Sequence, residues 1–467
     1  MQMYENGEAE RRRGSVTRSV AIVGAIVVTM DDDRRVIDGG TVVVEGGRIV
    51  AVAHDARDPR ADRIIDGRGH VVMPGLINCH MHTRPGRALG DGMPLFEWHS
   101  LYPDGLCREM TVEDSRAGSL VAFAEALKSG STTVMDMTCK PEGAVLAAEE
   151  IGIRALITPL AADTPWSDDG ACDSYPGTRD VIKAVAPTQA GALVQYWLGF
   201  DGINGVAETS LREMGELARQ LSIGIHGHMS ESRDDAGWTN REHGLPAAAY
   251  LNRAGVLGPR TVLAHCNWLT EQEIGLLRSS GTSVSHNPTS NMKIGTGICP
   301  VPDLLAAGVN VALGTDGMLS NFHLDMFQVM RGACQLQRIH RLDAQALSSG
   351  QVLTMATRNG ARAVGLGHEL GSIEVGKRAD LVTIDLERVH LRPFLRGRHD
   401  NLAGLLTWCV RGSDVDTVLV DGQVVVERGQ LTTMREKDII ARVQATAESV
   451  LHRIDTAERP VGHGHGH

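Results

Sequence analysis

Three histidines and one aspartate have the types and spacing of a metal site. His80 and His82 form an HxH pair after one apolar run, and His228 and Asp316 each end another such run. Alternate residues of an extended segment point the same way, so both histidines of the pair can face one point. Three imidazoles and one carboxylate suit a borderline divalent ion such as Zn²⁺, with Fe²⁺ as the alternative. An isolated HxH pair is commonly incidental, but three signals at the ends of predicted strands favour one bound ion.

The sequence around these residues indicates the scaffold that must position them. Apolar, β-branched runs alternate with amphipathic helical runs, which is typical of βα units around a parallel sheet. Eight such strand-like runs occur, at 71–79, 131–137, 153–160, 192–200, 222–228, 261–266, 282–287 and 310–316. We therefore predict the α/β class and a (β/α)8 TIM barrel. The metal-binding candidates then lie at the carboxyl ends of strands, where such barrels build their active sites.

The two ends of the chain differ from the middle in their pattern of apolar and turn residues. Short Val- and Ile-rich runs, broken by DG, GG and RG turns, predict one small β-sandwich domain built from the two ends. The predicted organisation is a flexible N-terminus at 1–18, the small β-sandwich domain at 19–72 plus 368–432, the catalytic barrel at 73–367, a C-terminal helix at 433–457, and a disordered His/Gly tail at 458–467. The tail can bind metal weakly, but its glycine spacing gives no fixed geometry.

Charge and composition exclude several classes of partner. The formal net charge is −11 and no basic patch stands out, so we expect no nucleic-acid partner. No apolar run approaches the length needed to span a bilayer, so we expect no membrane partner. The eight cysteines are scattered without a CxxC pair. In a chain of this length, that pattern favours reduced thiols and a cytoplasmic location over a disulfide framework.

Several motifs together resemble the amidohydrolase superfamily, and within it the cytosine-deaminase and chlorohydrolase-related (aminohydrolase) branch. They are GLINCHMH, IHGHMSE, VLAHCNWL, HNPTSNMKIGTG and VALGTDGMLSN, with GGRIVAV and GSIEVGKRADLV matching the small β domain that flanks the barrel. The resemblance covers nearly the whole chain. Binuclear members use a lysine of the fourth strand as a bridging carbamate, and the run ALVQYWLGF contains no lysine. The resemblance therefore implies a single metal ion.

The resemblance also assigns roles to individual residues. It implies that His80, His82, His228 and Asp316 hold the metal ion. The HxxE spacing selects His228 as the ligand because Glu231 follows it by three, which leaves His226 as a packing or supporting residue. Glu231 is implied to transfer protons, and His265 to contact the attacking water or the oxygen of the tetrahedral intermediate. Asp316 is implied to accept a proton from the water.

The reaction implied is hydrolytic deamination of an amino-substituted nitrogen heterocycle of purine, pterin, pyrimidine or s-triazine type. A metal-activated water attacks the ring carbon, and ammonia leaves once it is protonated. The partner is a small heterocyclic substrate, and members of the family are commonly homodimers or larger. Two alternatives stay open: a related hydrolase that removes chloride or an alkylamine or opens a cyclic amide, and a non-catalytic scaffold. The complete ligand set and Glu231 argue against the scaffold.

The residues that select the substrate are less well defined. A long loop follows the first barrel strand, and its Glu97-Trp98 pair resembles an acidic residue and tryptophan found in relatives that act on adenosyl compounds. Packing of the loop by its own Phe96 and Trp98 is an equal alternative. Arg84 and Asn287 are further candidates, although either can be merely solvated. FDGINGVAE stands where nucleoside deaminases carry a PHA-type motif, which argues against a nucleoside substrate.

Overall fold

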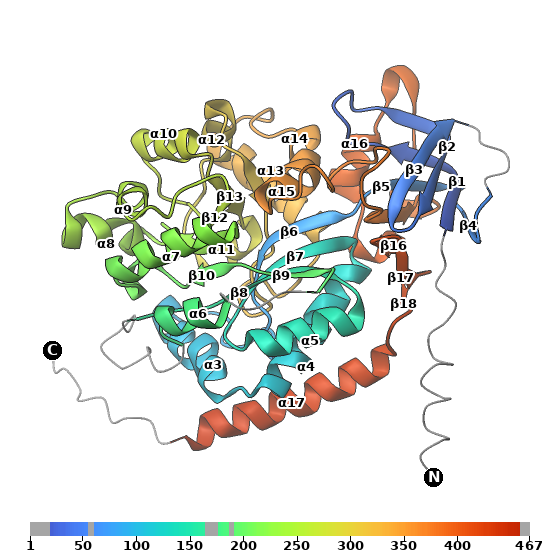
Figure 1. The fold of residues 1–467 in the computed structure, drawn as a ribbon. Coiled ribbons are helices and arrows are strands. Elements are labelled where there is room, and N and C mark those ends of the chain that lie inside the picture. Colours follow the sequence, from blue (N-terminus) through green and yellow to red (C-terminus); the bar gives the residue numbers. More distant parts are fainter. Residues whose placement is uncertain (1–18, 55–59, 164–175, 186–190, 458–467) are drawn as a thin grey trace, which may run out of the picture.

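The computed structural model describes residues 19–54, 60–163, 176–185 and 191–457. Within these ranges, a barrel of parallel strands carries a second, mixed β sheet at one end (Figure 1). The predicted α/β class, a TIM barrel with a β domain from both chain ends, is confirmed. The predicted flexible N-terminus at 1–18 and the His/Gly tail at 458–467 lie outside the described residues.

The barrel strands run parallel in two hydrogen-bonded sheets, ordered β6-β7-β8-β9 and β10-β11-β12-β13-β14. Their bounds are β6 (Leu76–Met81), β7 (Ser131–Thr138), β8 (Arg154–Pro159), β9 (Val194–Tyr196), β10 (Leu198–Phe200), β11 (Ile225–Met229), β12 (Thr261–His265), β13 (Ser283–His286) and β14 (Val311–Leu313). The backbone N–H of Asp316, just beyond β14, donates to the carbonyl of His80 in β6 at 2.9 Å. The last and first strands of the barrel therefore meet beside two of the predicted metal ligands.

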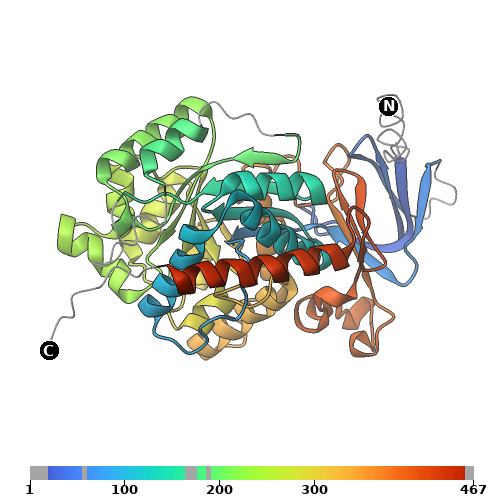
Figure 2. The same cartoon turned by 90° about the horizontal axis from the view of Figure 1, so that it is seen from below.

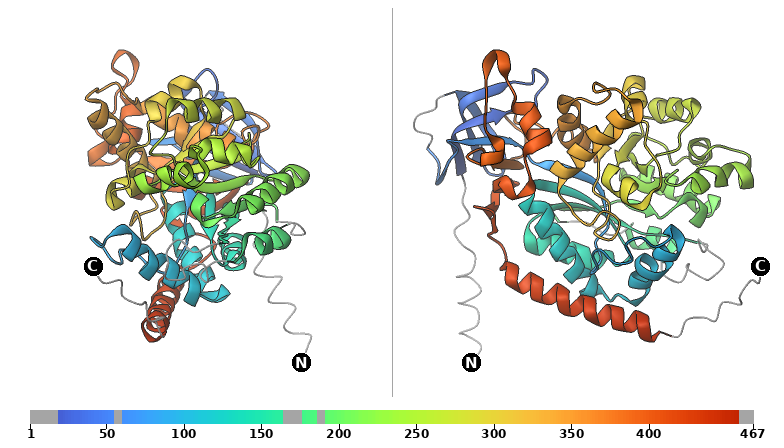
Figure 3. Two further views of the ribbon diagram at one scale, coloured as in Figure 1. Left: turned by 90° about the vertical axis from the view of Figure 1, so that its left-hand side faces the viewer. Right: turned by 180° about the vertical axis from the view of Figure 1, so that it is seen from behind.

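The second sheet combines strands from the two ends of the chain. It has nine strands in the order β18-β17-β16-β15-β5-β1-β2-β3, with β4 paired to β1. Their bounds are β1 (Ser19–Val28), β2 (Val36–Glu45), β3 (Arg48–His54), β4 (Arg63–Asp66), β5 (His70–Pro74), β15 (Leu381–Asp385), β16 (Val415–Val420), β17 (Gln423–Glu427) and β18 (Gln430–Leu431). Views from the side and from behind show the early and late strands lying together at one end of the barrel (Figure 3).

Two of the predicted strands are each divided into two. The run 71–79 divides at Gly75, so that β5 belongs to the second sheet and only β6 to the barrel. A Cβ on Gly75 would lie 2.2 Å from the side chain of Thr132, so glycine is required where the chain passes between the sheets. The run 192–200 divides at Trp197, so β9 pairs with β8 while β10 pairs with β11. Both predictions of one continuous strand are therefore wrong.

Helices cover the outside of the barrel. In α4, Thr111 caps the N-terminus by a reciprocal pair of hydrogen bonds with Asp114, and Leu120, Phe123 and Leu127 are buried against the strands. The helix bounds are α2 (Leu95–His99), α3 (Gly105–Glu109), α4 (Val112–Lys128), α5 (Pro141–Ile151), α6 (Thr178–Val185), α7 (Glu208–Leu221), α8 (Arg233–His243), α9 (Ala247–Arg253), α10 (Glu271–Ser280), α11 (Pro288–Ile294), α12 (Val301–Ala307), α13 (Met326–Arg341), α14 (Ser349–Thr354), α15 (Gly360–Ala363), α16 (Leu402–Gly404) and α17 (Glu436–Thr456). The long α17 crosses the barrel beside α3 and α4 (Figure 2).

One disulfide corrects the prediction that the cysteines are reduced. Cys107 in α3 and Cys139, just after β7, are bonded, with their Cα atoms 5.7 Å apart. They are 32 residues apart in the sequence, and no CxxC motif marks them, so only the packing of α3 against the barrel brings them together. The other described cysteines are free thiols. No helix in the described part of the chain is long and apolar enough to cross a membrane.

Candidate metal and active site

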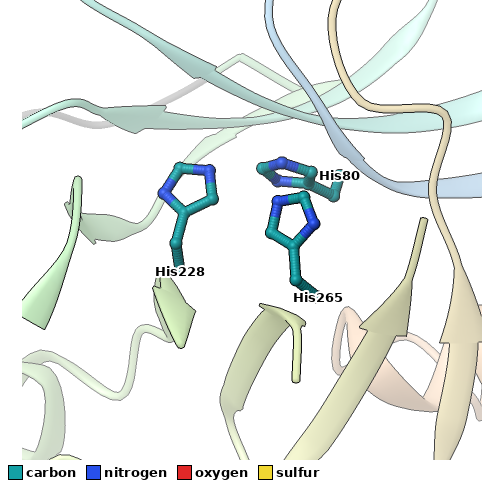
Figure 4. A group of neighbouring side chains, drawn as sticks. All are labelled: His80, His228 and His265. Carbon is teal, nitrogen blue, oxygen red and sulfur yellow. The ribbon is translucent and has the colours of Figure 1, made fainter. Parts of the chain in front are cut away.

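The four predicted ligands meet at the carboxyl ends of the barrel strands. Nε2 of His80 and Nε2 of His82 lie 3.5 and 3.6 Å from the same carboxylate oxygen of Asp316. Nε2 of His228 lies 3.2 Å from Nε2 of His82. All four side chains are buried. Figure 4 shows the rings of His80 and His228 beside that of His265, each projecting from the end of a strand into one space.

The hydrogen bonds of these histidines fix which nitrogen faces the centre. Nδ1 of His82 donates to the carbonyl of Met137 (2.7 Å), and Nδ1 of His228 donates to the carbonyl of Asp201. Burial holds the pKa of both imidazoles well below the usual value, so both rings are neutral. A neutral ring carries one proton, and here that proton is on Nδ1. The Nε2 lone pairs of both rings are therefore free to bind a cation.

The same reasoning extends to His80 through His226. Nδ1 of His226 donates to the carbonyl of Val262 (2.8 Å), so its Nε2 accepts a hydrogen bond from Nδ1 of His80 (2.8 Å). These two hydrogen bonds leave the lone pair of His80 Nε2 pointing at the centre of the site. That buried atom has no hydrogen-bond partner among the described residues. His226 thus orients a predicted ligand, as supporting groups do in metal sites.

The donor atoms fit a divalent ion. Two unprotonated nitrogens 3.2 Å apart, on His82 and His228, repel each other unless a cation lies beside both. The orphaned Nε2 of His80 and the carboxylate of Asp316 complete a set of three nitrogens and one oxygen, which suits zinc. Oδ2 of Asp316 also accepts a hydrogen bond from Ser290 Oγ (2.6 Å). Its Oδ1 accepts the backbone N–H of Gly317 (2.7 Å), and hydrogen bonds donated to a carboxylate favour its ionised form.

His265 and Glu231 stand beside this donor set. Nε2 of His265 is 3.7 Å from a carboxylate oxygen of Glu231 and 4.0 Å from Oδ2 of Asp316. Nδ1 of His265 donates to the side-chain oxygen of Asn291 (2.8 Å). The amide of Asn291 donates to Asn267 (2.7 Å), whose own amide donates to the backbone carbonyl of Glu231 (2.8 Å). A chain of two asparagines therefore fixes both residues at once.

The backbone is strained where these residues leave their strands. Ser230, His265, Cys266 and Asp316 all have positive φ, at 50°, 70°, 52° and 62°. Side chains other than glycine rarely adopt this region, and such residues concentrate at functional sites. The strain turns the chain sharply at the ends of β11, β12 and β14. Of these four residues, His265 and Asp316 line the cavity at the barrel mouth.

A cavity with an empty volume of about 940 Å³, counting the space at its mouth, opens over the donor set. Among the predicted substrate contacts, Arg84 and Trp98 line it. Glu97 is exposed and does not line it, and Asn287 lies fully buried beneath, 3.5 Å from Nδ1 of His265.

Three further groups that can carry charge also line the cavity, namely Asp201, Asp235 and His99. Burial raises the pKa of Asp201 to about 6, and burial likewise raises that of Asp235 to about 6. In His99, by contrast, the charged form is favoured. Although burial disfavours its charge, the carboxylate of Asp104, 3.3 Å from its Nδ1, raises the pKa of His99 to about 9. Of these, Asp201 had a signal, since it is the aspartate of the unusual FDGINGVAE segment.

Two curated relatives match nearly all of the chain. A 5′-deoxyadenosine deaminase of Methanothermobacter thermautotrophicus is 36% identical over 431 residues, covering 92% of this chain and 98% of the relative. A 5-methylthioadenosine/S-adenosylhomocysteine deaminase of Thermoanaerobacter pseudethanolicus is 32% identical over 439 residues, covering 93% of this chain and all of the relative.

Solved structures with bound zinc have the same fold. An adenosine deaminase from Xanthomonas campestris has a TM-score of 0.83 and 29% identity, with 92% of this chain and 98% of the other covered. An atrazine chlorohydrolase from Arthrobacter aurescens has a TM-score of 0.84 and 26% identity, with 92% and 100% covered. The model of the amidohydrolase family matches residues 71–425. With the two curated relatives, that match confirms the predicted resemblance: this chain belongs to the amidohydrolase family, in its aminohydrolase branch.

Proposed function

We propose that the protein is a metal-dependent hydrolytic deaminase of an amino-substituted nitrogen heterocycle. The observation that carries the proposal is the placement of Glu231 and His265 beside three imidazoles and a carboxylate, under one cavity. Both curated relatives described above are named deaminases, one of 5′-deoxyadenosine and one of 5-methylthioadenosine/S-adenosylhomocysteine, which supports the proposal. Zinc is the proposed ion because the donor set suits it and two structural neighbours hold it, with Fe²⁺ as the alternative.

Each of the proposed site residues has its own role in the reaction. A divalent ion held by His80, His82, His228 and Asp316 would supply a water whose pKa is lowered to about 7. Asp316 accepts the first proton of the attacking water. Glu231 delivers a proton to the ring nitrogen next to the carbon under attack, which relieves the charge that develops there. His265 hydrogen-bonds the new oxygen.

The leaving group explains why a carboxylic acid is needed. As the carbon–oxygen bond forms, the ring carbon becomes tetrahedral, and the carbon–nitrogen bond then breaks. An amine is a poor leaving group until it is protonated, so a proton must be passed to the exocyclic nitrogen before ammonia departs. Loss of chloride needs no such proton. The chlorohydrolase among the structural neighbours keeps removal of chloride as the second candidate function.

A panel of substrates separates the two candidates. Ammonia and chloride release would be measured from aminopurines, pterins, cytosine, amino-triazines and chloro-triazines, with the bound metal quantified in the same sample. We expect ammonia from at least one aminoheterocycle and loss of activity when a chelator removes the metal. Release of chloride alone, or activity that survives metal removal, contradicts the proposal. The predicted cytoplasmic location and homo-oligomeric state stay predictions, and gel filtration tests the second.

Glu231→Gln is the sharpest single test of the proton-transfer role. The amide cannot carry the proton, so we expect kcat to fall by about 10²–10⁴-fold while the metal content stays that of the wild type. Glu242→Gln is the matched control, since Glu242 is exposed on α8 and makes the same change outside the cavity. A Glu231→Gln variant with near-normal turnover would remove Glu231 from the mechanism.

A further inference from the structure

Arg84 is a buried arginine whose terminal nitrogens have no hydrogen-bond partner among the residues that the structure describes. Only 7% of the residue is exposed, and it lines the cavity over the metal-binding candidates. Its Nε donates to Sγ of Cys107 (3.4 Å). Within the described part of the chain, no carboxylate oxygen lies within 4.0 Å of its guanidinium, and no hydrogen bond is made by Nη1 or Nη2. The charged end of Arg84 therefore faces the cavity.

This arrangement is unusual for a structural arginine. Taking a guanidinium out of water is costly, and buried arginines are normally paired with carboxylates. Among the described residues, the buried Arg154 follows that rule, with hydrogen bonds to Asp380 of 2.9 and 3.0 Å. Arg84 is also the one arginine or lysine among the described residues that line this cavity. The buried carboxyls of Asp136 and Asp201 lie near enough to interact electrostatically with Arg84, but neither makes a hydrogen bond to it. The N–H donors of its terminal nitrogens are therefore expected to bind a ligand.

The backbone next to Arg84 is held in place by hydrogen bonds of the preceding residue. Both the N–H and the hydroxyl of the preceding Thr83 donate to the buried carboxylate of Asp136, at 3.1 and 2.7 Å. Arg84 also follows the candidate ligand His82 by two residues, on the same segment. The guanidinium is thus presented to the cavity by a rigid segment, which reduces the entropy lost when it binds.

We propose that Arg84 binds an oxygen acceptor of the substrate, either a carbonyl on the heterocycle or a carboxylate on its substituent. The inference rests on the proposed deaminase function and narrows its substrate class. The planar, permanently charged fork of arginine matches such oxygens, singly or as a pair. A substrate without an acceptor oxygen leaves the N–H donors of the buried guanidinium without a hydrogen bond, so it is discriminated against.

Two pairs of compounds test the two sources of the oxygen. S-adenosylhomocysteine carries a carboxylate that 5′-deoxyadenosine lacks, and guanine carries a ring carbonyl that 2-aminopurine lacks. For each pair, kcat/KM would be measured by ammonia release. The dissociation constants of the deaminated products would be measured by calorimetry, which does not depend on turnover. We expect the wild type to prefer the oxygen-bearing member of one pair in both measurements.

Arg84→Gln is expected to reduce that preference by about 10- to 100-fold, the effect of losing a hydrogen bond to a charged group. The member without the oxygen should change only a few-fold, and Arg84→Lys should recover part of the preference. Arg108→Gln is the matched control, because Arg108 is exposed on α3, next to Cys107 and outside the cavity. Metal content and thermal unfolding would confirm that each variant is folded.

Two results overturn the inference: a wild type that prefers neither oxygen-bearing compound, or a preference that survives in Arg84→Gln. Failure of the deaminase proposal gives a different result. In that case no ammonia is released from any compound, while the calorimetric preference and its dependence on Arg84 remain.

Discussion

His226 decides which nitrogen of His80 is available for a metal ion. Because Nδ1 of His226 is committed to the carbonyl of Val262, its Nε2 must accept the proton of His80 Nδ1. Without that acceptor, the proton on the His80 ring is free to move to Nε2, where it would block the site. A residue outside the set of proposed ligands thus sets the tautomer of one of them.

Replacing His226 with leucine should weaken metal binding. We expect a rise in the metal dissociation constant of about 10- to 100-fold, the usual effect of removing a hydrogen-bond partner from a metal-binding histidine. Titration of the metal-free protein with Zn²⁺ measures it. His286→Leu is the control, since His286 is equally buried at the end of β13 but neither ring nitrogen has a hydrogen-bond partner in the described structure. Equal effects of the two variants would show a packing role only.

Among individual residues, the sequence predicts the proposed metal ligands better than it predicts the residues that hydrogen-bond those ligands. The alternation of an extended segment places His80 and His82 together, and the strand order brings Asp316 to them. The pairing of His226 with His80 depends on contacts between β6 and β11, which no local spacing records. Glu97 is the opposite case, because its sequence context predicts a position in the cavity that it does not have in the structure. It stands in a sequence context that resembles a substrate contact, yet the short helix α2 turns it to solvent and turns Trp98 inward.

At the scale of elements, α17 supports one wall of the cavity from outside the barrel. Val450 and Ile454 of this helix pack in one buried cluster with Leu106, Cys107 and Trp98. Trp98 lines the cavity, so the C-terminal helix and the cavity wall share a hydrophobic cluster. Apolar contacts of this kind are worth on the order of 25 cal/mol per Å² buried.

Shortening Ile454 should destabilise the protein through this cluster. Ile454→Ala leaves a cavity among buried side chains, so we expect a loss of about 2–4 kcal/mol in the free energy of unfolding. Urea denaturation measures the loss. Ile440→Ala makes the same change on the same helix at a residue that is 61% exposed, and it should cost less than about 0.5 kcal/mol. Similar losses from both variants would mean that α17 does not pack as described.

The breaks within strands could not both be read from composition. In the run 71–79, the dipeptide Pro74-Gly75 is a local signal for a break, whereas nothing local marks where the run 192–200 changes partner. At Trp197, the indole ring packs against Gly224, where a Cβ would lie 2.2 Å from the ring. The disulfide between Cys107 and Cys139 is a similar case. Each such feature is set by a residue distant in sequence, whereas the number and order of strands follow from local periodicity.

At the scale of the whole molecule, one buried ion pair joins the barrel to the second sheet. Arg154 begins β8 at the end of the barrel away from the cavity, and Asp380 immediately precedes β15. Nε and Nη2 of Arg154 donate to the two carboxylate oxygens of Asp380 at 3.0 and 2.9 Å, with both side chains almost fully buried. Asp380 also accepts the backbone N–H of Asp421 (2.8 Å). The pair therefore ties a barrel strand to two segments of the second sheet.

Breaking this ion pair between the barrel and the second sheet should lower the free energy of unfolding without changing the catalytic activity. Asp380→Asn leaves the Arg154 guanidinium buried with only the more distant carboxylate of Asp421 (3.6 Å), so we expect a loss of about 3–5 kcal/mol in the free energy of unfolding. Thermal and urea denaturation measure it. Glu213→Gln removes one charge from an exposed pair with Arg179 and should cost less than about 1 kcal/mol. Because the cavity lies at the opposite end of the strands, the folded Asp380→Asn protein should keep its kcat/KM. A stable Asp380→Asn variant would show that burial of apolar side chains alone holds the second sheet on the barrel.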